Sequence, residues 1–186
     1  MPENFERQNQ EENLPEEKRD VQEKSELIFR DLRIEDCDDM VKAINSVVGE
    51  GASIQRKEKT TREEWLPILQ NILERTRSGQ DICVAAEKNG HIVGWLGGKL
   101  MEGKTDMPTA EVFTAILSKE GRGGLKNFLD LAESWLERAQ KEWKIKKVVT
   151  ETSLENRALK LYKFIGFVES GPAEKEGYVK LEKNLE

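Results

Sequence analysis

The sequence predicts a single α/β domain over residues 27–186, in which a mixed central β-sheet of about six to seven strands has about four helices on its two faces. Three observations support this fold class. Strand-like and helix-like apolar patterns follow one another in the order β-α-α-β-β-β-α-β-α-β-β. Asn89-Gly90 marks a hairpin in the middle of the chain. Strand–helix–strand crossovers near the end require parallel neighbours, so the sheet is mixed.

The first half of the domain is predicted to form one strand and two helices. Thr61 and Glu64 make a capping box before an apolar run, which begins the second helix. Gly49 ends the first helix and Ser78-Gly79 ends the second. The expected elements are a strand at 27–33, a helix from 35 or 36 to about 48, and a helix from 62 to about 76.

The second half is predicted to form alternating strands and helices around a long amphipathic helix. That helix begins near residue 125, directly after a glycine cluster, and repeats apolar residues at helical spacing. The other expected elements are strands at 82–87, 91–97, 110–117 and 145–150, a short helix at 156–165, a strand from 166 and a last strand at 178–181.

The negative charge is concentrated at the start of the chain. Residues 1–26 hold nine acidic and four basic side chains, whereas the whole chain has a formal net charge of -6. This segment has few apolar residues, so we expect a disordered acidic tail. The remaining domain is nearly neutral, which argues against a nucleic-acid partner.

The composition also bears on compartment and membrane contact. Cys37 and Cys83 are the two cysteines and lie far apart, and the polar, acidic start of the sequence does not predict a secretion signal. We expect free thiols in a cytoplasmic protein. No run of eighteen apolar residues occurs, so no membrane partner is expected. The single histidine, His91, follows the hairpin turn and is interpreted as a turn residue, and no metal site is expected.

A glycine cluster precedes the long helix and suits an anion. Gly121, Gly123 and Gly124 surround Arg122 and lead into Leu125 and Lys126. Backbone N–H groups at a helix N-terminus are unpaired and attract phosphate, and glycines allow close approach. An ordinary glycine-rich turn is the alternative, and neither of the common nucleotide-binding glycine patterns is present.

The stretch 148–171 contains a more specific pattern. Asn156, Ala158, Tyr162 and Gly166-Phe167 are spaced as in a strand–helix–strand unit. This spacing resembles the closing motif of the GNAT acyltransferases. The resemblance extends over about residues 27–184 and implies a GNAT fold and transfer of an acetyl group from acetyl-CoA to a primary amine by direct attack in a ternary complex.

The resemblance also implies which residues bind coenzyme A. The glycine cluster would bind the pyrophosphate, and Asn156 would lie near the cofactor arm. The strand at 112–117 would contact the acyl and pantetheine parts and would diverge from the strand that contains Thr150. The implied binding residues are Ile116, Leu117, Arg122, Gly123, Gly124, Leu125, Lys126, Asn156 and Tyr162. Lys126 stands where the family has a small residue, so it either crowds the phosphates or extends outward.

Tyr162 and Glu111 are the predicted catalytic residues. Tyr162 would protonate the departing thiolate, and a core aromatic is the alternative interpretation. Glu111 resembles the glutamate that many family members use as a base, although an outward-facing strand residue is equally compatible. Glu151 and Ser153 are substitutes for the base, and Glu50 is a candidate for attracting a cationic amine.

The sequence leaves the acceptor and the oligomeric state open. A small-molecule amine and a protein or peptide amine both fit, as do a monomer and a homodimer. The alternative function is a binding module that kept the GNAT fold but lost turnover, and that binds CoA or another protein. Core packing is expected for the tryptophans on apolar faces, and Trp143 is expected to cover the end of the long helix.

Overall fold

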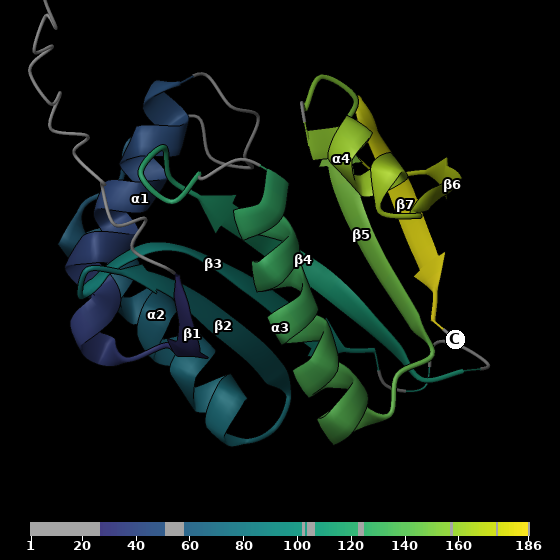
Figure 1. Cartoon of the computed structure of the whole chain (residues 1–186), viewed down its shortest axis with the longest axis horizontal. Helices are drawn as coiled ribbons and strands as arrows, with labels where there is room; N and C mark the ends of the chain where they lie inside the picture. The colour runs from purple at the N-terminus through teal and green to yellow at the C-terminus, as the bar shows by residue number, and fades with distance from the viewer. Residues whose placement is uncertain are drawn as a thin grey trace, which may run out of the picture.

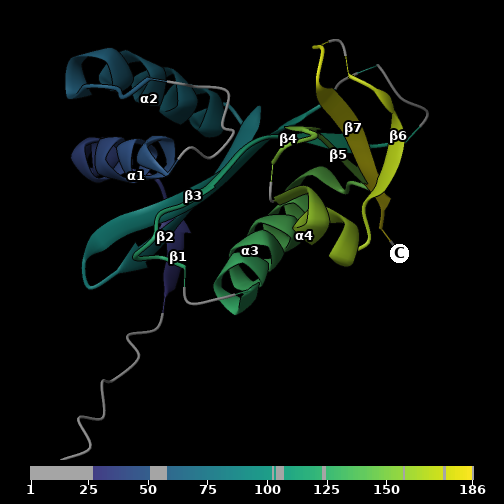
Figure 2. The same ribbon diagram turned by 90° about the horizontal axis from the view of Figure 1, so that it is seen from above.

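The computed structural model describes residues 27–50, 58–101, 103, 107–122, 125–156, 158–173 and 175–185. The acidic segment predicted for residues 1–26 lies outside these ranges. The described residues form a three-layer arrangement, in which α1 and α2 lie on one side of a twisted sheet and α3 and α4 lie on the other (Figure 2).

The elements follow the order predicted from the sequence, with a short 3-10 turn at Ile34–Asp36 before the first helix. The helices are α1 (Cys37–Gly49), α2 (Arg62–Arg77), α3 (Leu125–Trp143) and α4 (Ala158–Phe164). The strands are β1 (Ile28–Asp31), β2 (Asp81–Lys88), β3 (His91–Leu100), β4 (Thr109–Leu117), β5 (Lys147–Ser153), β6 (Val168–Pro172) and β7 (Tyr178–Asn184) (Figure 1).

The seven strands form one mixed sheet in the order β1-β2-β3-β4-β5-β7-β6. Only β4 and β5 pair in parallel, and every other neighbouring pair is antiparallel. This is the mixed sheet that the sequence predicts, because the crossover through α3 returns the chain in the direction of β4. The parallel pair divides the sheet into two antiparallel parts.

Local sequence signals explain two of the element boundaries. Asn89 and Gly90 have φ of 53° and 81°, as the predicted hairpin turn requires. Thr61 and Glu64 form the predicted reciprocal capping box at the start of α2. Thr61 and Glu64 satisfy backbone N–H groups that lack a partner at the start of the helix. Asn89 and Gly90 adopt the positive φ that the turn needs. Both boundaries therefore depend on residues that are neighbours in the sequence.

Two apolar cores lie on opposite faces of the sheet. One packs α3 against the sheet around Trp135 and Leu131, and the other packs α1 and α2 around Met40 and Trp95. Cys37 and Cys83, both buried and unpaired, belong to the second core. Burial raises the pKa of the Cys83 thiol to about 12, so it behaves as an inert core residue.

Helix α3 approaches β3 closely because glycine stands at the contact. A Cβ atom on Gly98 would lie 2.3 Å from Cζ2 of Trp135, well inside van der Waals contact. The same indole donates a hydrogen bond from Nε1 to the Ile82 carbonyl at 3.0 Å, so it cannot move away freely. The close approach therefore depends on the missing side chain.

We expect Gly98→Ala to lower the free energy of unfolding by about 1–3 kcal/mol, because an extra methyl group must displace a hydrogen-bonded core side chain. Chemical denaturation monitored by circular dichroism measures the change. Gly49→Ala is the matched control, since a Cβ there meets no atom within 4 Å. Equal stability of the two variants would contradict the packing interpretation.

Candidate active site

The sheet opens between its two parallel strands. Their pairing runs from Thr109 opposite Lys147 to Val112 opposite Thr150 and extends no further. Strand β4 continues to Leu117, so its last five residues have no strand partner on the β5 side within the described ranges. Apart from the Leu117 carbonyl, which accepts a hydrogen bond from Arg122 Nε at 2.9 Å, the backbone N–H and C=O groups that these residues turn to that side are available to a ligand, as at the edge of a sheet.

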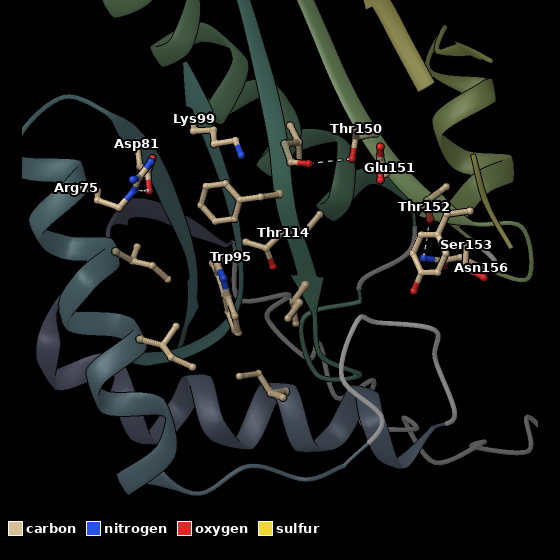
Figure 3. A pocket seen from close by; sticks show the side chains of 18 of the residues that line it. Arg75, Asp81, Trp95, Lys99, Thr114, Thr150, Glu151, Thr152, Ser153 and Asn156 are labelled. Atoms are coloured by element: carbon tan, nitrogen blue, oxygen red, sulfur yellow. Dashed lines mark hydrogen bonds and ion pairs between the residues drawn. The ribbon is translucent and has the colours of Figure 1, made fainter. Parts of the chain in front are cut away.

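A bulge in β4 coincides with the point where the strands separate. Gly97 of β3 pairs with Thr114 and Gly98 pairs with Val112, which leaves Phe113 as an extra residue. A bulge bends its strand and increases its twist. The Thr150 hydroxyl donates a hydrogen bond to the Val112 carbonyl at 3.0 Å and closes the paired part of the two strands (Figure 3).

A cavity of about 620 Å³ occupies this opening and continues toward α2. We call the part between the diverging strands the gap half and the part beneath the helices the α2 half. Figure 3 shows Thr150, Glu151, Thr152, Ser153 and Asn156 on one side of β4 and Trp95, Arg75 and Asp81 on the other. The gap half is lined by Val112, Thr114, Ala115, Ile116, Thr150, Glu151, Thr152, Ser153, Asn156, Tyr162 and Tyr178, and the α2 half by Ile44, Trp65, Ile68, Asn71, Ile72, Arg75, Asp81, Trp95, Lys99 and Phe113.

Tyr162 lines the gap half and also packs in the core. Its ring makes edge-to-face contacts with Phe128 and Phe167, with centroid distances of 6.3 Å and 5.4 Å. Burial raises the pKa of the Tyr162 phenol to about 12, and interaction with the Thr150 side chain offsets part of this effect. Tyr162 is therefore a core aromatic that also lines the cavity, and its raised pKa keeps the phenol protonated at neutral pH.

Asn156 lies at the start of α4 and lines the gap half. Its amide donates from Nδ2 to Thr152 Oγ1 at 3.0 Å, and its Oδ1 accepts from the Ala158 N–H at 2.9 Å. These bonds hold the carboxamide in one orientation and connect α4 to the end of β5. The family resemblance predicts that Asn156 lies near the cofactor arm, and this stays a prediction.

The two candidate carboxylates occupy different places. Glu111 lies in the paired part of β4, does not line the cavity, and forms an ion pair with Lys99 at 3.0 Å. Glu151 lines the gap half, and its carboxylate is 3.8 Å from Lys180 Nζ. Of the substitutes, Ser153 also lines the cavity, and its hydroxyl accepts from the Glu155 N–H at 3.2 Å. Of Glu111 and Glu151, Glu151 is thus the one whose side chain lines the cavity.

The glycine cluster is only partly described, because Gly123 and Gly124 lie outside the described residues. Arg122 donates from Nε to the Leu117 carbonyl at 2.9 Å and pairs through Nη1 with Glu50 at the end of α1. This pairing lowers the pKa of Glu50. Glu50, predicted as an attractor of a cationic amine, instead has an arginine as its partner.

The remaining predicted cofactor residues lie around α3 and the end of β4. Lys126 is largely exposed and pairs with Asp130 one turn along the helix, so its side chain extends outward. Leu125 is 44% exposed at the helix start. Ile116 lines the cavity, whereas Leu117 packs against the α3 core. The structure thus brings Ile116, Asn156 and Tyr162 together.

Sequence reasoning missed the role of two tryptophans. Trp65 and Trp95 pack in the second core, as expected for apolar faces, but they also line the α2 half. Their rings are 6.0 Å apart and tilted by 49°. Both indole nitrogens are buried without a hydrogen-bond partner, and such an orphan donor costs about 1–3 kcal/mol. No local pattern distinguishes a cavity wall from a core.

Charged side chains of the α2 half are paired within the protein. Arg75 binds Asp81 through two hydrogen bonds of 2.9 Å and 2.8 Å, and Figure 3 shows the two side chains facing one another. Asp81 is 3% exposed, so the guanidinium compensates a buried carboxylate. Together with the Lys99–Glu111 pair, this arrangement leaves the α2 half close to neutral.

In the described part of the chain, no three His, Cys, Asp or Glu side chains gather as ligands for a metal ion. None of the described helices combines the length and apolar character needed to cross a membrane. His91 is exposed beside the hairpin turn, and its Nδ1 lies 3.1 Å from Asp39 Oδ2. It does not line the cavity between β4 and α2.

Comparison with solved structures defines the fold. PaiA N-acetyltransferase from Thermoplasma acidophilum, in complex with coenzyme A, aligns with a TM-score of 0.69 and 17% identity over 86% of this chain and 99% of that one. Ribosomal-protein-alanine N-acetyltransferase from Brucella melitensis aligns with a TM-score of 0.62 and 22% identity over 86% of this chain and 100% of that one.

An acetyltransferase of the GNAT family from Streptococcus pneumoniae gives a TM-score of 0.65 at 22% identity, over 86% of this chain and 100% of that one. Neither the protein-family models nor the curated proteins gave a match to this chain. The structural neighbours are GNAT acetyltransferases over most of the chain. The protein therefore has the GNAT fold, as its closing motif predicts.

We expect the Tyr162 phenol of the native protein to ionise near pH 12. The ultraviolet absorbance of phenolate measures this ionisation. The chain has two tyrosines, so Tyr162→Phe removes this step cleanly. An unfolded tyrosine ionises near about pH 10. The raised native pKa therefore contributes stability that is present below pH 10 and lost as the pH rises toward 12. Loss in the variant of a step near pH 10, instead of near pH 12, would contradict the burial of this phenol.

Proposed function

We propose that the protein is an N-acetyltransferase that transfers the acetyl group of acetyl-CoA to a primary amine by direct attack in a ternary complex. The observation that carries the proposal is the cavity at the opened edge of β4, on a GNAT fold. An extended amide-containing arm such as pantetheine is suited to pair with the free backbone groups of β4 in the manner of an added strand.

The two halves of the cavity suit the two reactants. The cofactor arm would enter from the α3 side and present its thioester in the gap half, near Ile116 and Asn156. The phosphates would lie near the glycine cluster, where Arg122 and the N-terminus of α3 supply positive charge. Lys126 pairs with Asp130, one turn along α3. In this orientation its side chain would extend away from the phosphates. The amine would approach through the α2 half.

The chemistry requires that the amine nitrogen attack the thioester carbon, forming a C–N bond as the C–S bond breaks. The proton lost by the amine passes to a base, and the sulfur leaves as a thiolate. We assign the base to Glu151, directly or through water, because its side chain lines the gap half. Glu111 then has a supporting role, in which it holds the ammonium of Lys99 at the cavity wall.

Tyr162 would stabilise the departing sulfur. A phenol with a pKa of about 12 is a weaker acid than a thiol of about 8.5, so complete proton transfer to the thiolate is uphill. The phenol is instead suited to donate a hydrogen bond to the sulfur as its negative charge develops. The released thiolate then takes up a proton from solvent.

We expect Glu151→Gln and Tyr162→Phe each to lower kcat by about 10²-fold, the range typical of a positioned proton-transfer or charge-stabilising group. Release of free thiol from acetyl-CoA with a panel of amines measures the rate. Glu111→Gln is the matched control and should lower kcat less than about threefold, because that carboxylate lies outside the cavity lining.

Calorimetric titration with acetyl-CoA tests the cofactor separately from turnover. Saturable binding together with thiol release supports the proposed transferase. Binding without thiol release for any amine would favour the alternative, a GNAT-fold binding module without turnover. Absence of binding at millimolar acetyl-CoA would contradict the transferase and a CoA-binding module alike, and would leave only a protein-interaction module.

A further inference from the structure

One wall of the α2 half presents hydrogen-bond donors that a ligand can reach. Arg75 of α2 and Lys99 of β3 both line the cavity, and Figure 3 shows them on the same side of β4. Their side chains are 40% and 41% exposed. Asn71, one turn before Arg75 on α2, is exposed and also lines the cavity, so its carboxamide can donate there as well.

The guanidinium of Arg75 has an unused edge. Its Nε and Nη2 donate to the two carboxylate oxygens of Asp81 at 2.9 Å and 2.8 Å. A guanidinium has five N–H groups, so three remain, two on Nη1 and one on Nη2. No described residue accepts a hydrogen bond from Nη1. Because the buried Asp81 fixes the orientation of the side chain, this edge is preorganised for a second planar anion.

Lys99 lies directly beside this pair. It is opposite Asp81 on β2 and opposite Glu111 on β4, so the three side chains project from the same face of the sheet. Its ammonium has three N–H groups and pairs with Glu111 at 3.0 Å. Asp81 is 3% exposed, and Glu111 does not line the cavity. Although the α2 half is close to neutral, a ligand there therefore meets the cations of two ion pairs rather than their carboxylates.

The candidate base lies on the same face of the sheet, two strands away. Val149 of β5 pairs with Glu111, and Glu151 follows two residues later, so its side chain projects from the face that carries Lys99. Neighbouring strands lie about 4.8 Å apart, so β3 and β5 are roughly 10 Å apart where they pair with β4. An acceptor that reaches both ends must carry its two charged groups several bonds apart.

We propose that the acceptor is a primary amine that carries a carboxylate at the far end of an aliphatic chain. This proposal rests on the transferase function proposed above and names the substrate class of the same site. The carboxylate would pair with Arg75 and Lys99, and the amine would extend into the gap half toward Glu151. The chain between them would lie against Ile72 and Phe113, which give the α2 half an apolar surface.

Binding of the amine alone tests this class. Isothermal titration calorimetry of the full chain, without cofactor and with saturating coenzyme A, would compare 6-aminohexanoate with 6-aminohexanamide, which differ in charge but hardly in size. We expect the acid to bind about tenfold more tightly, because only its carboxylate makes charge-assisted hydrogen bonds to both cations. Spermidine, which has no anionic group, should bind more weakly than the acid. Equal binding of acid and amide, or tighter binding of spermidine, would overturn the proposal.

Variants of the two cations test the anion site directly. Lys99→Met keeps the length of the side chain but removes its charge. Arg75→Gln is combined with Asp81→Asn, so that no carboxylate stays buried without a partner. In each variant the preference for the acid over the amide should fall toward unity. An unchanged preference in either variant, once its melting temperature shows that it is folded, would overturn the two-cation site.

Arg77→Gln is the matched control for these variants. Arg77 is an exposed cation of the same helix, two residues beyond Arg75, and it does not line the cavity. Its loss should leave the preference for the acid at about tenfold, because it removes a positive charge without touching the proposed site. A preference that falls as far as in Lys99→Met would show a general charge effect and would overturn the assignment.

The thiol-release assay separates this inference from the proposed function. Acetyl transfer to spermidine but not to 6-aminohexanoate would leave the transferase in place and overturn the amino-carboxylate class. Preferential binding of 6-aminohexanoate by a protein that does not bind acetyl-CoA would support the ligand class and contradict the transferase. Transfer to 6-aminohexanoate at a higher kcat/KM than to 6-aminohexanamide would support both.

Discussion

The early end of pairing between β4 and β5 is the constraint on which the rest of the site depends. Because the two strands part after Val112 and Thr150, the sheet contains an internal edge with unpaired backbone groups. The bulge at Phe113 and the hydrogen bond from Thr150 fix where this edge begins. A fully paired sheet would separate the α3 side from the α2 side, whereas the opening connects them through one cavity.

Much of the fold could be predicted from the sequence because its signals are local. Turn residues, caps and apolar periods depend on neighbours within a few positions, and the hairpin at Asn89 and the capping box at Thr61 both formed as predicted. The closing motif pointed to the family fold for the same reason. Its residues lie within one strand–helix–strand unit, where spacing in the chain translates directly into spacing in the structure.

The candidate site was harder to predict because its features depend on distant parts of the chain. The pairing of Arg122 with Glu50 joins segments 72 residues apart, and nothing near either residue indicates it. Glu111 and Glu151 are equivalent as sequence patterns, and only the register of the parallel strands places one away from the opening and the other beside it. Likewise Trp65 satisfies a core pattern whether or not the space beside it is filled.

The pair between Arg122 and Glu50 has a consequence for how the protein would respond to ionic strength. An arginine already bound to a carboxylate exchanges one anion for another when a phosphate arrives, so the number of ion pairs stays constant. Salt weakens the Arg122–Glu50 pair, which makes its replacement by phosphate easier. Salt also weakens the new contact between Arg122 and the phosphate, which lowers the affinity. The two effects oppose each other. Cofactor binding would therefore vary less steeply with salt than the charge of the diphosphate alone suggests.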